Sequence, residues 1–127
     1  PNTALVPEAG QMLMEEISEL GPQDLLIAIG LRRRPPILGQ TMKLMQEQAV
    51  PIAYITDRRA VSTTKYATWT MPCQVRGTSL FDSCVGVVSL LNFICTRATE
   101  FAGLEGRNRM RRVEEMLDLL GELDPGN

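Results

Sequence analysis

The sequence contains no histidine. Ser-His-Asp and Cys-His catalytic arrangements and histidine-ligated zinc sites therefore cannot be built from one copy of the chain. Proton transfer near neutral pH would need a perturbed Glu, Asp, Lys or Cys side chain instead. The sequence thus predicts no catalytic residue, no metal site and no cofactor, and we expect a protein that is not an enzyme.

A basic excess is also absent, because 13 lysines and arginines stand against 15 aspartates and glutamates. Surfaces that bind nucleic acids or membranes usually carry such an excess. The charge-free stretch over residues 83–96 is too short to span a bilayer. The first residues lack the basic start and long apolar run of a signal peptide. We therefore expect a cytoplasmic protein with no membrane contact.

The cysteines are few, odd in number and set in apolar segments: Cys73, Cys84 and Cys95. This pattern indicates small buried side chains in a reducing compartment and disfavours a disulfide framework or a metal site. The length of 127 residues suits one domain over residues 1–127. A hydrophobic content of 44% predicts a packed core.

Apolar runs of strand length alternate with segments of helical periodicity. Buried parallel strands are predicted at residues 24–30, 51–55 and 68–72, and a further short strand at 3–6. Helices are predicted at residues 8–20, 36–49, 79–101 and 107–120, with a helical turn at 61–67. The predicted fold class is α/β: a three-layer sandwich with a parallel sheet of about four strands flanked by helices, flavodoxin-like or Rossmann-like.

The two C-terminal helices differ in character. The helix at residues 79–101 is apolar nearly all round and is expected to be buried in a core or against another subunit. Ser79 and Asp82 approximate a capping box at its start. The last helix is amphipathic, with Met110, Val113, Leu117 and Leu120 on its inner face. Its arginines at 107, 109, 111 and 112 indicate a solvated face or a partner contact. No helix-turn-helix pattern is present, so DNA binding is not encoded in this chain.

Candidate ligand-binding residues lie at the carboxyl ends of the predicted strands, where open parallel sheets bind ligands. Arg32, Arg33 and Arg34 precede a predicted helix. Guanidinium groups hold phosphate or carboxylate bidentately, and a helix N-terminus favours an anion. The two prolines that follow remove backbone donors. A solvated loop, or pairing with acidic groups of a partner, is about as well supported.

The remaining candidates are weaker. Thr56 and Asp57 are placed to bind a sugar hydroxyl, or they form an ordinary turn after a strand. Ser62 and Ser79 are equally typical of helix starts. The complete predicted ligand-binding set is Gly30, Arg32, Arg33, Arg34, Thr56, Asp57, Ser62 and Ser79.

The order of these segments resembles the sugar isomerase (SIS) domain of RpiR-type transcriptional regulators. Residues 20–29 look like the second strand of such domains, and the Ile-Thr-Asp at 55–57 looks like the end of the third. The Ser-Leu-Phe-Asp-Ser at 79–83 is similar to the Ser-Phe-Phe-Asp-Ser that opens the family's long penultimate helix. The resemblance covers nearly all of the chain and depends on the ordered set, since no single motif is specific.

The resemblance implies a domain that binds a phosphorylated sugar or similar anionic metabolite, forms a homodimer and follows an N-terminal helix-turn-helix domain, through which alone the protein would contact DNA. The family's first strand, helix and glycine-serine loop would precede Thr3, which implies that the chain is a C-terminal fragment of a longer regulator. The family's phosphate loop, Ser-x-Ser-Gly-x-Thr, falls on residues 30–35, where arginine and proline replace the hydroxyl groups.

Two alternatives remain beside this sensing and dimerising function. A phosphosugar isomerase-type enzyme would need a general base near the arginines. Glu100 is the carboxylate considered for that role, but it follows an apolar helix and has no histidine to assist it. The other alternative is a structural dimerisation domain without a ligand, which would associate through the helix at residues 79–101.

Overall fold

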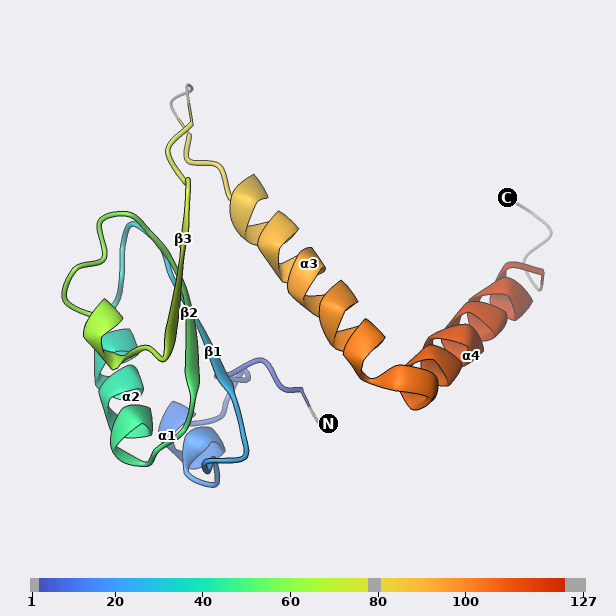
Figure 1. Ribbon diagram of the computed structural model, residues 1–127, viewed down its shortest axis with the longest axis horizontal. Helices are drawn as coiled ribbons and strands as arrows, with labels where there is room; N and C mark the ends of the chain where they lie inside the picture. The colour runs from blue at the N-terminus through green and yellow to red at the C-terminus, as the bar shows by residue number, and fades with distance from the viewer. Residues whose placement is uncertain (1–2, 78–80, 123–127) are drawn as a thin grey trace. The chain divides into compact units, whose positions relative to one another are not determined.

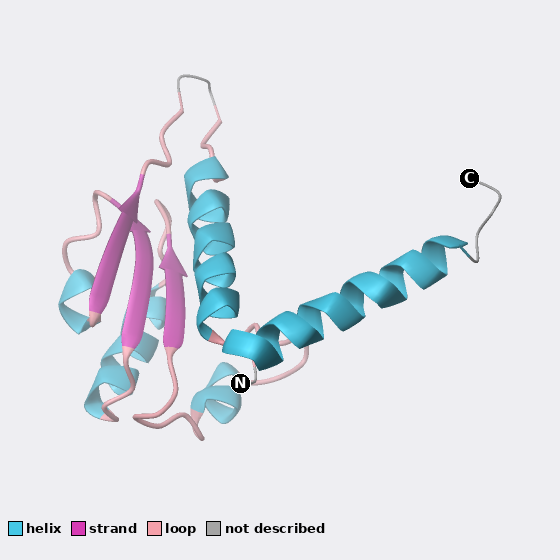
Figure 2. Cartoon of the chain, turned by 45° about the vertical axis from the view of Figure 1, so that its right-hand side comes forward, coloured by secondary structure: helices cyan, strands magenta, loops and turns pink. Residues whose placement is uncertain are grey.

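The computed structural model describes residues 3–77 and 81–122. The chain forms two compact units, Pro1–Ser83 and Cys84–Asn127. The first unit holds a parallel sheet in the order β1-β2-β3, made of β1 (Leu26–Gly30), β2 (Ile52–Asp57) and β3 (Trp69–Cys73) (Figure 1). The three arrows point the same way in Figure 2. The α/β class and the parallel sheet are confirmed, but the sheet has three strands instead of about four.

Burial differs strongly among the strands. Every residue of β2, the central strand, is buried. In β1 only Ala28 and Gly30 are buried, while Ile27 and Ile29 are 40% and 44% exposed. In β3, Trp69 is 56% exposed. The prediction of three strands buried on both faces is therefore wrong for β1 and β3: in β1 the alternation of buried and exposed residues shows that only one face is covered.

The predicted strand at residues 3–6 is wrong, because this segment takes no part in the sheet and Leu5 is 86% exposed. The predicted helix at residues 8–20 is shortened to α1 (Leu13–Ile17). Gly10 has a positive φ of 86°, and the Gln11 N–H donates to the Glu8 carbonyl oxygen in a turn. A left-handed residue cannot continue an α-helix, so the helix begins after it.

One face of the sheet packs against α1 and α2 (Pro36–Glu47). Pro36 stands at the first helical position, where its missing N–H costs nothing. The buried core cluster consists of Ile17, Ala28, Met42, Met45, Val50, Ile52 and Tyr54. The short 3-10 helix η1 (Thr64–Tyr66) lies against α2, as Figure 1 shows. The predicted helix at 36–49 and the helical turn at 61–67 are confirmed.

The second unit consists of α3 (Val85–Phe101) and α4 (Gly103–Glu122). Ala102 separates the two helices, Gly103 at the start of α4 has a φ of 67°, and the pair is bent by 117° at the break. The prediction that this helix begins at Ser79 is wrong: residues 81–84 are described and are not helical, and the N-cap of α3 is Cys84. Asp82 does not cap the helix, because its carboxylate binds Arg32. Ser79 itself lies outside the described residues.

The apolar side chains of this unit are less buried than the sequence predicts. In α3 only Val87 is buried, while Val85, Val88 and Phe93 are exposed. The stripe on α4 predicted as an inner face is also exposed, at Met110, Val113, Leu117 and Leu120. The prediction of buried cysteines is wrong as well: Cys84 and Cys95 are exposed and Cys73 is half-buried, all as free thiols.

Within the described parts of the chain, no single helix is both long enough and apolar enough to cross a membrane. The bent pair α3 and α4 meets the length and composition criteria only when the two helices are taken together.

Gly30, the last residue of β1, lies where the chain has no room for a side chain. An added Cβ would stand 2.5 Å from Leu38 Cδ2 and 2.7 Å from the Tyr54 hydroxyl oxygen. Tyr54 is fully buried and its hydroxyl accepts a hydrogen bond of 3.0 Å from Thr63 Oγ1. The absence of a Cβ therefore lets the phenol ring pack directly against the backbone of β1.

We expect Gly30→Ala to lower the free energy of unfolding by about 1–3 kcal/mol, because the methyl group overpacks the contact with Tyr54 and Leu38. Gly21→Ala is the matched control: nothing lies within 4 Å of its added Cβ. Its effect should stay within about 1 kcal/mol of zero. Urea denaturation of both variants measures the difference, and equal stabilities would contradict the packing account.

Candidate functional site

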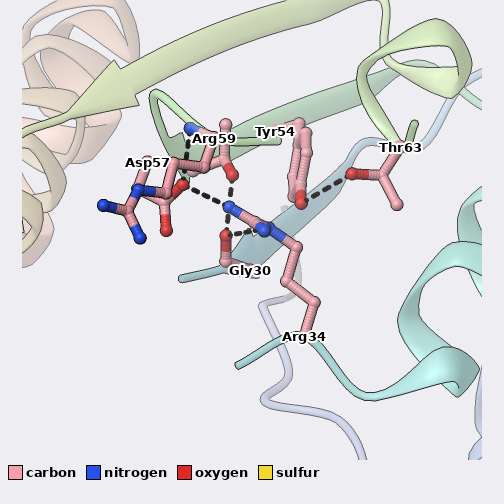
Figure 3. A network of polar contacts seen from close by, with 7 residues as sticks. Gly30, Arg34, Tyr54, Asp57, Arg59 and Thr63 are labelled. Atoms are coloured by element: carbon pink, nitrogen blue, oxygen red, sulfur yellow. Dashed lines mark hydrogen bonds and ion pairs between the residues drawn. The ribbon is translucent and has the colours of Figure 1, made fainter. Parts of the chain in front are cut away.

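Polar groups gather at the carboxyl ends of β1 and β2, which lie at the same edge of the parallel sheet. Asp57 ends β2 and forms an ion pair with Arg34, from the loop after β1 (Figure 3). Arg34 Nε also donates to the Gly30 carbonyl oxygen at 3.1 Å. The Thr56 hydroxyl donates to the same oxygen at 2.7 Å. The ends of two neighbouring strands are thus joined by side chains as well as by the sheet.

The Asp57–Arg34 pair is largely withdrawn from solvent, with side-chain exposures of 10% and 18%. Burial alone would raise the pKa of the Asp57 carboxyl group. The hydrogen bond from the Arg59 backbone N–H, the charge and hydrogen bond of Arg34, and a hydrogen bond from the Arg32 backbone N–H outweigh burial, so the pKa lies below its ordinary value. Asp57 is therefore ionised at neutral pH and serves as a fixed counter-charge.

The backbone after β2 is held by the same carboxylate. The Arg59 N–H donates to Asp57 Oδ1 at 2.8 Å, as Figure 3 shows. This short-range contact resembles an Asx turn, in which a side-chain oxygen fixes the chain two residues ahead. The side chains of Arg58 and Arg59 therefore leave from a turn whose start is fixed by Asp57.

A second ion pair lies closer to the surface. Arg32 Nη1 donates to both carboxylate oxygens of Asp82, at 2.8 and 2.7 Å. The two side chains are 58% and 35% exposed. The hydrogen bond to Asp82 raises the pKa of Arg32 above its ordinary value. This pair joins the loop after β1 to the segment that precedes α3.

A pocket of about 130 Å³ opens beside these pairs at the strand ends. Its lining residues are Arg32, Asp57, Arg58, Arg59, Cys73, Gln74, Arg76 and Asp82. Four arginines thus face two aspartates, and both aspartates already bind an arginine. Among the described residues, Arg58, Arg59 and Arg76 form no ion pair. The pocket therefore carries an uncompensated positive charge.

The structure distributes the predicted ligand-binding residues unevenly. Arg32 and Asp57 line the pocket, whereas Gly30, Arg34 and Thr56 are not among its lining residues and contact one another and Asp57. Arg33 and Ser62 are exposed and do not line it. Ser79 lies outside the described residues.

The pocket also contains Arg58, Arg59 and Arg76, which are not among the binding residues predicted from the sequence. Arg58 and Arg59 directly follow the Asp that ends β2, and Arg76 follows β3. Applying the strand-end rule to every basic residue, and not only to the triple arginine, would have found them.

The pocket is equipped for binding an anion by charge and hydrogen bonds. A guanidinium group offers five N–H donors in a planar fork and stays protonated at any physiological pH. The carboxylates that could act as a base are both held in ion pairs. Over residues 3–77 and 81–122, no group of His, Cys, Asp and Glu side chains is arranged to hold a metal ion.

A comparison with solved structures finds the sugar isomerase domain of the RpiR transcription factor from Sphaerobacter thermophilus, with a TM-score of 0.71 and 21% sequence identity. The match covers 85% of this chain and 60% of that chain. The predicted likeness to a sugar isomerase domain of an RpiR-type regulator is therefore confirmed for the fold. No family model matches the sequence, and no curated protein matches it.

We expect Asp57→Asn to lower the free energy of unfolding by about 3 kcal/mol, because it leaves the withdrawn Arg34 guanidinium without a counter-charge. Asp82→Asn breaks the exposed pair with Arg32 and should cost no more than about 1 kcal/mol. Chemical denaturation at pH 7 measures both values. Equal losses in the two variants would show that burial does not distinguish the pairs.

The stability that the Asp57–Arg34 ion pair contributes depends on pH. The folded-state pKa of Asp57 lies below its unfolded value, so its stabilisation is complete above the unfolded pKa of about 4 and is lost as pH falls through the folded pKa. The stability difference between wild type and Asp57→Asn should therefore shrink as the pH is lowered below about 4. A difference that stays constant over that range would rule out this linkage.

Proposed function

We propose that this chain is the metabolite-sensing domain of a transcriptional regulator, and that the arginine-lined pocket binds the anionic group of a sugar phosphate or similar metabolite. The observation that carries the proposal is the set of unpaired arginines at the strand ends, Arg58, Arg59 and Arg76. Unpaired guanidinium groups lining one small cavity gain most from a ligand that brings the missing negative charge.

The two ion pairs support this assignment by explaining which arginines remain for a ligand. Arg34 is occupied by Asp57, and Arg32 shares one of its nitrogens with Asp82. In the predicted anion-binding loop at residues 32–34, Arg32 and Arg34 therefore mainly hold the pocket together through ion pairs, and the free donors for a ligand come from other arginines. Arg33 is exposed and outside the lining, so the proposal assigns it no contact with the ligand.

The fold relative supports the regulatory part of the proposal, because the matched protein is an RpiR transcription factor. This chain covers 60% of the matched chain, so the whole protein's activity and partners are part of the proposal. We propose that residues 1–127 act as one sensing domain of a cytoplasmic regulator and that DNA is contacted by a separate N-terminal domain. We further infer binding without turnover, because both pocket carboxylates are engaged by arginine.

Self-association is the second part of the proposal, and α4 supports it. Its exposed stripe at Met110, Val113, Leu117 and Leu120 follows the 3-4-3 spacing of helices that pair with another helix. We propose a homodimer in which α4 pairs with α4 of a second copy. The distribution of charge along the helix favours the antiparallel direction: four arginines lie between 107 and 112, and only acidic charges lie beyond 112.

An antiparallel pair places the basic half of each α4 beside the acidic half of the other. This arrangement also offsets an unfavourable feature of the single helix, since arginines near its N-terminus oppose the helix dipole. A ligand could shift the dimer only by binding one of its arrangements more tightly than the other. The sensing and pairing parts of the proposal are therefore tested separately.

Arg76→Gln should weaken binding of sugar phosphates about tenfold or more, because it removes charged hydrogen bonds to the anion. Arg33→Gln, with the same change of charge outside the pocket, should bind like wild type. Thermal shift and isothermal titration against inorganic phosphate and a panel of sugar phosphates measure this, since a ligand of the folded state raises the Tm.

No response of the wild type to any of these ligands would overturn the sensing proposal. Equal weakening in Arg33→Gln and Arg76→Gln would show general charge attraction instead of a site. Aldose-ketose interconversion of a sugar phosphate by the purified chain, followed in a coupled assay, would establish the isomerase alternative.

Leu117→Glu should convert the dimer to a monomer at micromolar concentrations, because it places a charge in the middle of the paired stripe. Asn108→Glu adds the same charge to the polar side of α4 and should leave the dimer intact. Light scattering after size exclusion gives the mass of each variant. A dimer that survives Leu117→Glu but is lost in Val88→Glu would move the interface to α3.

A further inference from the structure

One side of α3 carries a largely exposed stripe of small and apolar side chains: Cys84, Val88, Leu91 and Cys95. Both cysteines and Val88 are exposed, and Leu91 is half-buried. The Val88 N–H donates to the Cys84 carbonyl oxygen at 3.0 Å, so the N-cap Cys84 is in register with the helix. The spacing of four, three and four residues keeps the stripe on one face, as in helices that pack against another helix.

The stripe lies in a stretch without charge. No Asp, Glu, Lys or Arg occurs from residue 83 to residue 96. The nearest charged residues are Asp82 before this stretch and Arg97 after it, and their charges are opposite. Two copies of the helix packed antiparallel bring the acidic end of each stripe toward the basic end of the other, whereas a parallel pair brings like charges together. The charge pattern therefore favours a second copy in the antiparallel direction.

The stripe is also symmetric about its midpoint, between residues 89 and 90. Its spacing reads the same in both directions, so two antiparallel copies stack the four positions in four layers. The two inner layers join Val88 of one copy to Leu91 of the other. The two outer layers join Cys84 of one copy to Cys95 of the other. A two-fold contact has to be self-complementary, and this stripe meets that requirement.

The outer layers bring pairs of thiols within bonding range. Packed helix axes lie about 8–10 Å apart and each Cα lies about 2.3 Å from its axis, so facing Cα atoms reach the separation of about 4.4–6.8 Å that a disulfide spans. Within one chain Cys84 and Cys95 cannot bond, because the helix separates them by about 16 Å. The arrangement therefore supports bridges between copies and excludes a bridge within one copy.

We propose that α3 is a contact surface for a second copy of this chain, on which two α3 helices pack antiparallel and an oxidant closes two Cys84–Cys95 disulfides between the copies. Each bridge loses two electrons and two protons, which a peroxide accepts. One thiolate attacks a peroxide oxygen and becomes a sulfenic acid as water leaves, and the facing thiol then displaces the remaining oxygen as a second water. Under reducing conditions the thiols pack as small apolar side chains.

The contact goes beyond the proposed sensing function, because it uses neither the arginine-lined pocket nor α4. Hydrogen peroxide treatment of the 127-residue chain carrying Cys73→Ser, followed by a non-reducing denaturing gel, detects it. The product should be a covalent dimer that a reductant dissociates. A ladder of larger species should not form, because both cysteines of one chain bond to the same partner.

A complementation experiment tests the register of the pair. Cys84→Ser or Cys95→Ser alone should slow dimer formation at least about tenfold, because like cysteines lie about 16 Å apart in the antiparallel pair. An equimolar mixture of the two variants should regain about a quarter of the parent rate. Half of the encounters in the mixture join unlike chains, and each such pair forms one bridge instead of two.

Two matched charge variants test the inner layers. Val88→Glu places an unpaired charge inside the contact and should slow dimer formation at least about tenfold. Ser89→Glu adds the same charge on another side of α3, at an exposed residue, and should leave the rate unchanged. Alkylation by iodoacetamide measures thiol reactivity in each variant, so dimer rates are compared per reactive thiol. The covalent dimer should also form in Leu117→Glu, because α4 takes no part in the bridges.

A mixture that forms dimers no faster than its two components would overturn the proposal, and so would equal rates in Val88→Glu and Ser89→Glu. Single cysteine variants that react as fast as the parent, or a ladder of larger species, would show collisions of exposed thiols instead of a defined contact. Loss of the covalent dimer in Leu117→Glu would assign the bridges to copies held together by α4. None of these outcomes bears on the pocket, whose ligand tests are separate.

Discussion

The ion pair between Asp57 and Arg34 is the interaction on which the strand-end site depends. Asp57 ends β2, whose residues are all buried, so its position is set by the core. Its carboxylate holds the loop after β1 through Arg34 and the turn after β2 through the Arg59 N–H. One buried charge therefore fixes two segments that have no regular secondary structure of their own.

This arrangement separates arginines that support the site from arginines that remain for a ligand. A buried carboxylate needs a counter-charge, and Arg34 supplies it at the edge of the core. Arg32 is committed in part to Asp82. The positive charge that is left over is local, and it exists in a chain whose formal net charge is -2. Overall charge is thus a poor guide to the ligand preference of a single cavity.

The sequence predicts the elements that depend on local pattern. The apolar runs that became β1, β2 and β3 and the periodic segment that became α2 are found with small differences at their ends. The sequence does not predict which face of each strand is covered by other elements. Ile27 and Ile29 are therefore predicted to be buried, whereas the structure exposes them. The sequence also does not predict the ion-pair partners of Arg32 and Arg34, because these partners are 50 and 23 residues away in the chain.

The contact between Gly30 and Tyr54 has a consequence for how this domain can vary among homologous chains. The phenol oxygen and the last Cα of β1 occupy adjoining space, so residues 30 and 54 are not independent choices. A larger residue at position 30 becomes tolerable only when position 54 gives up part of its ring or its hydroxyl. The two positions should therefore change together, and aligned sequences would record the contact as a covarying pair.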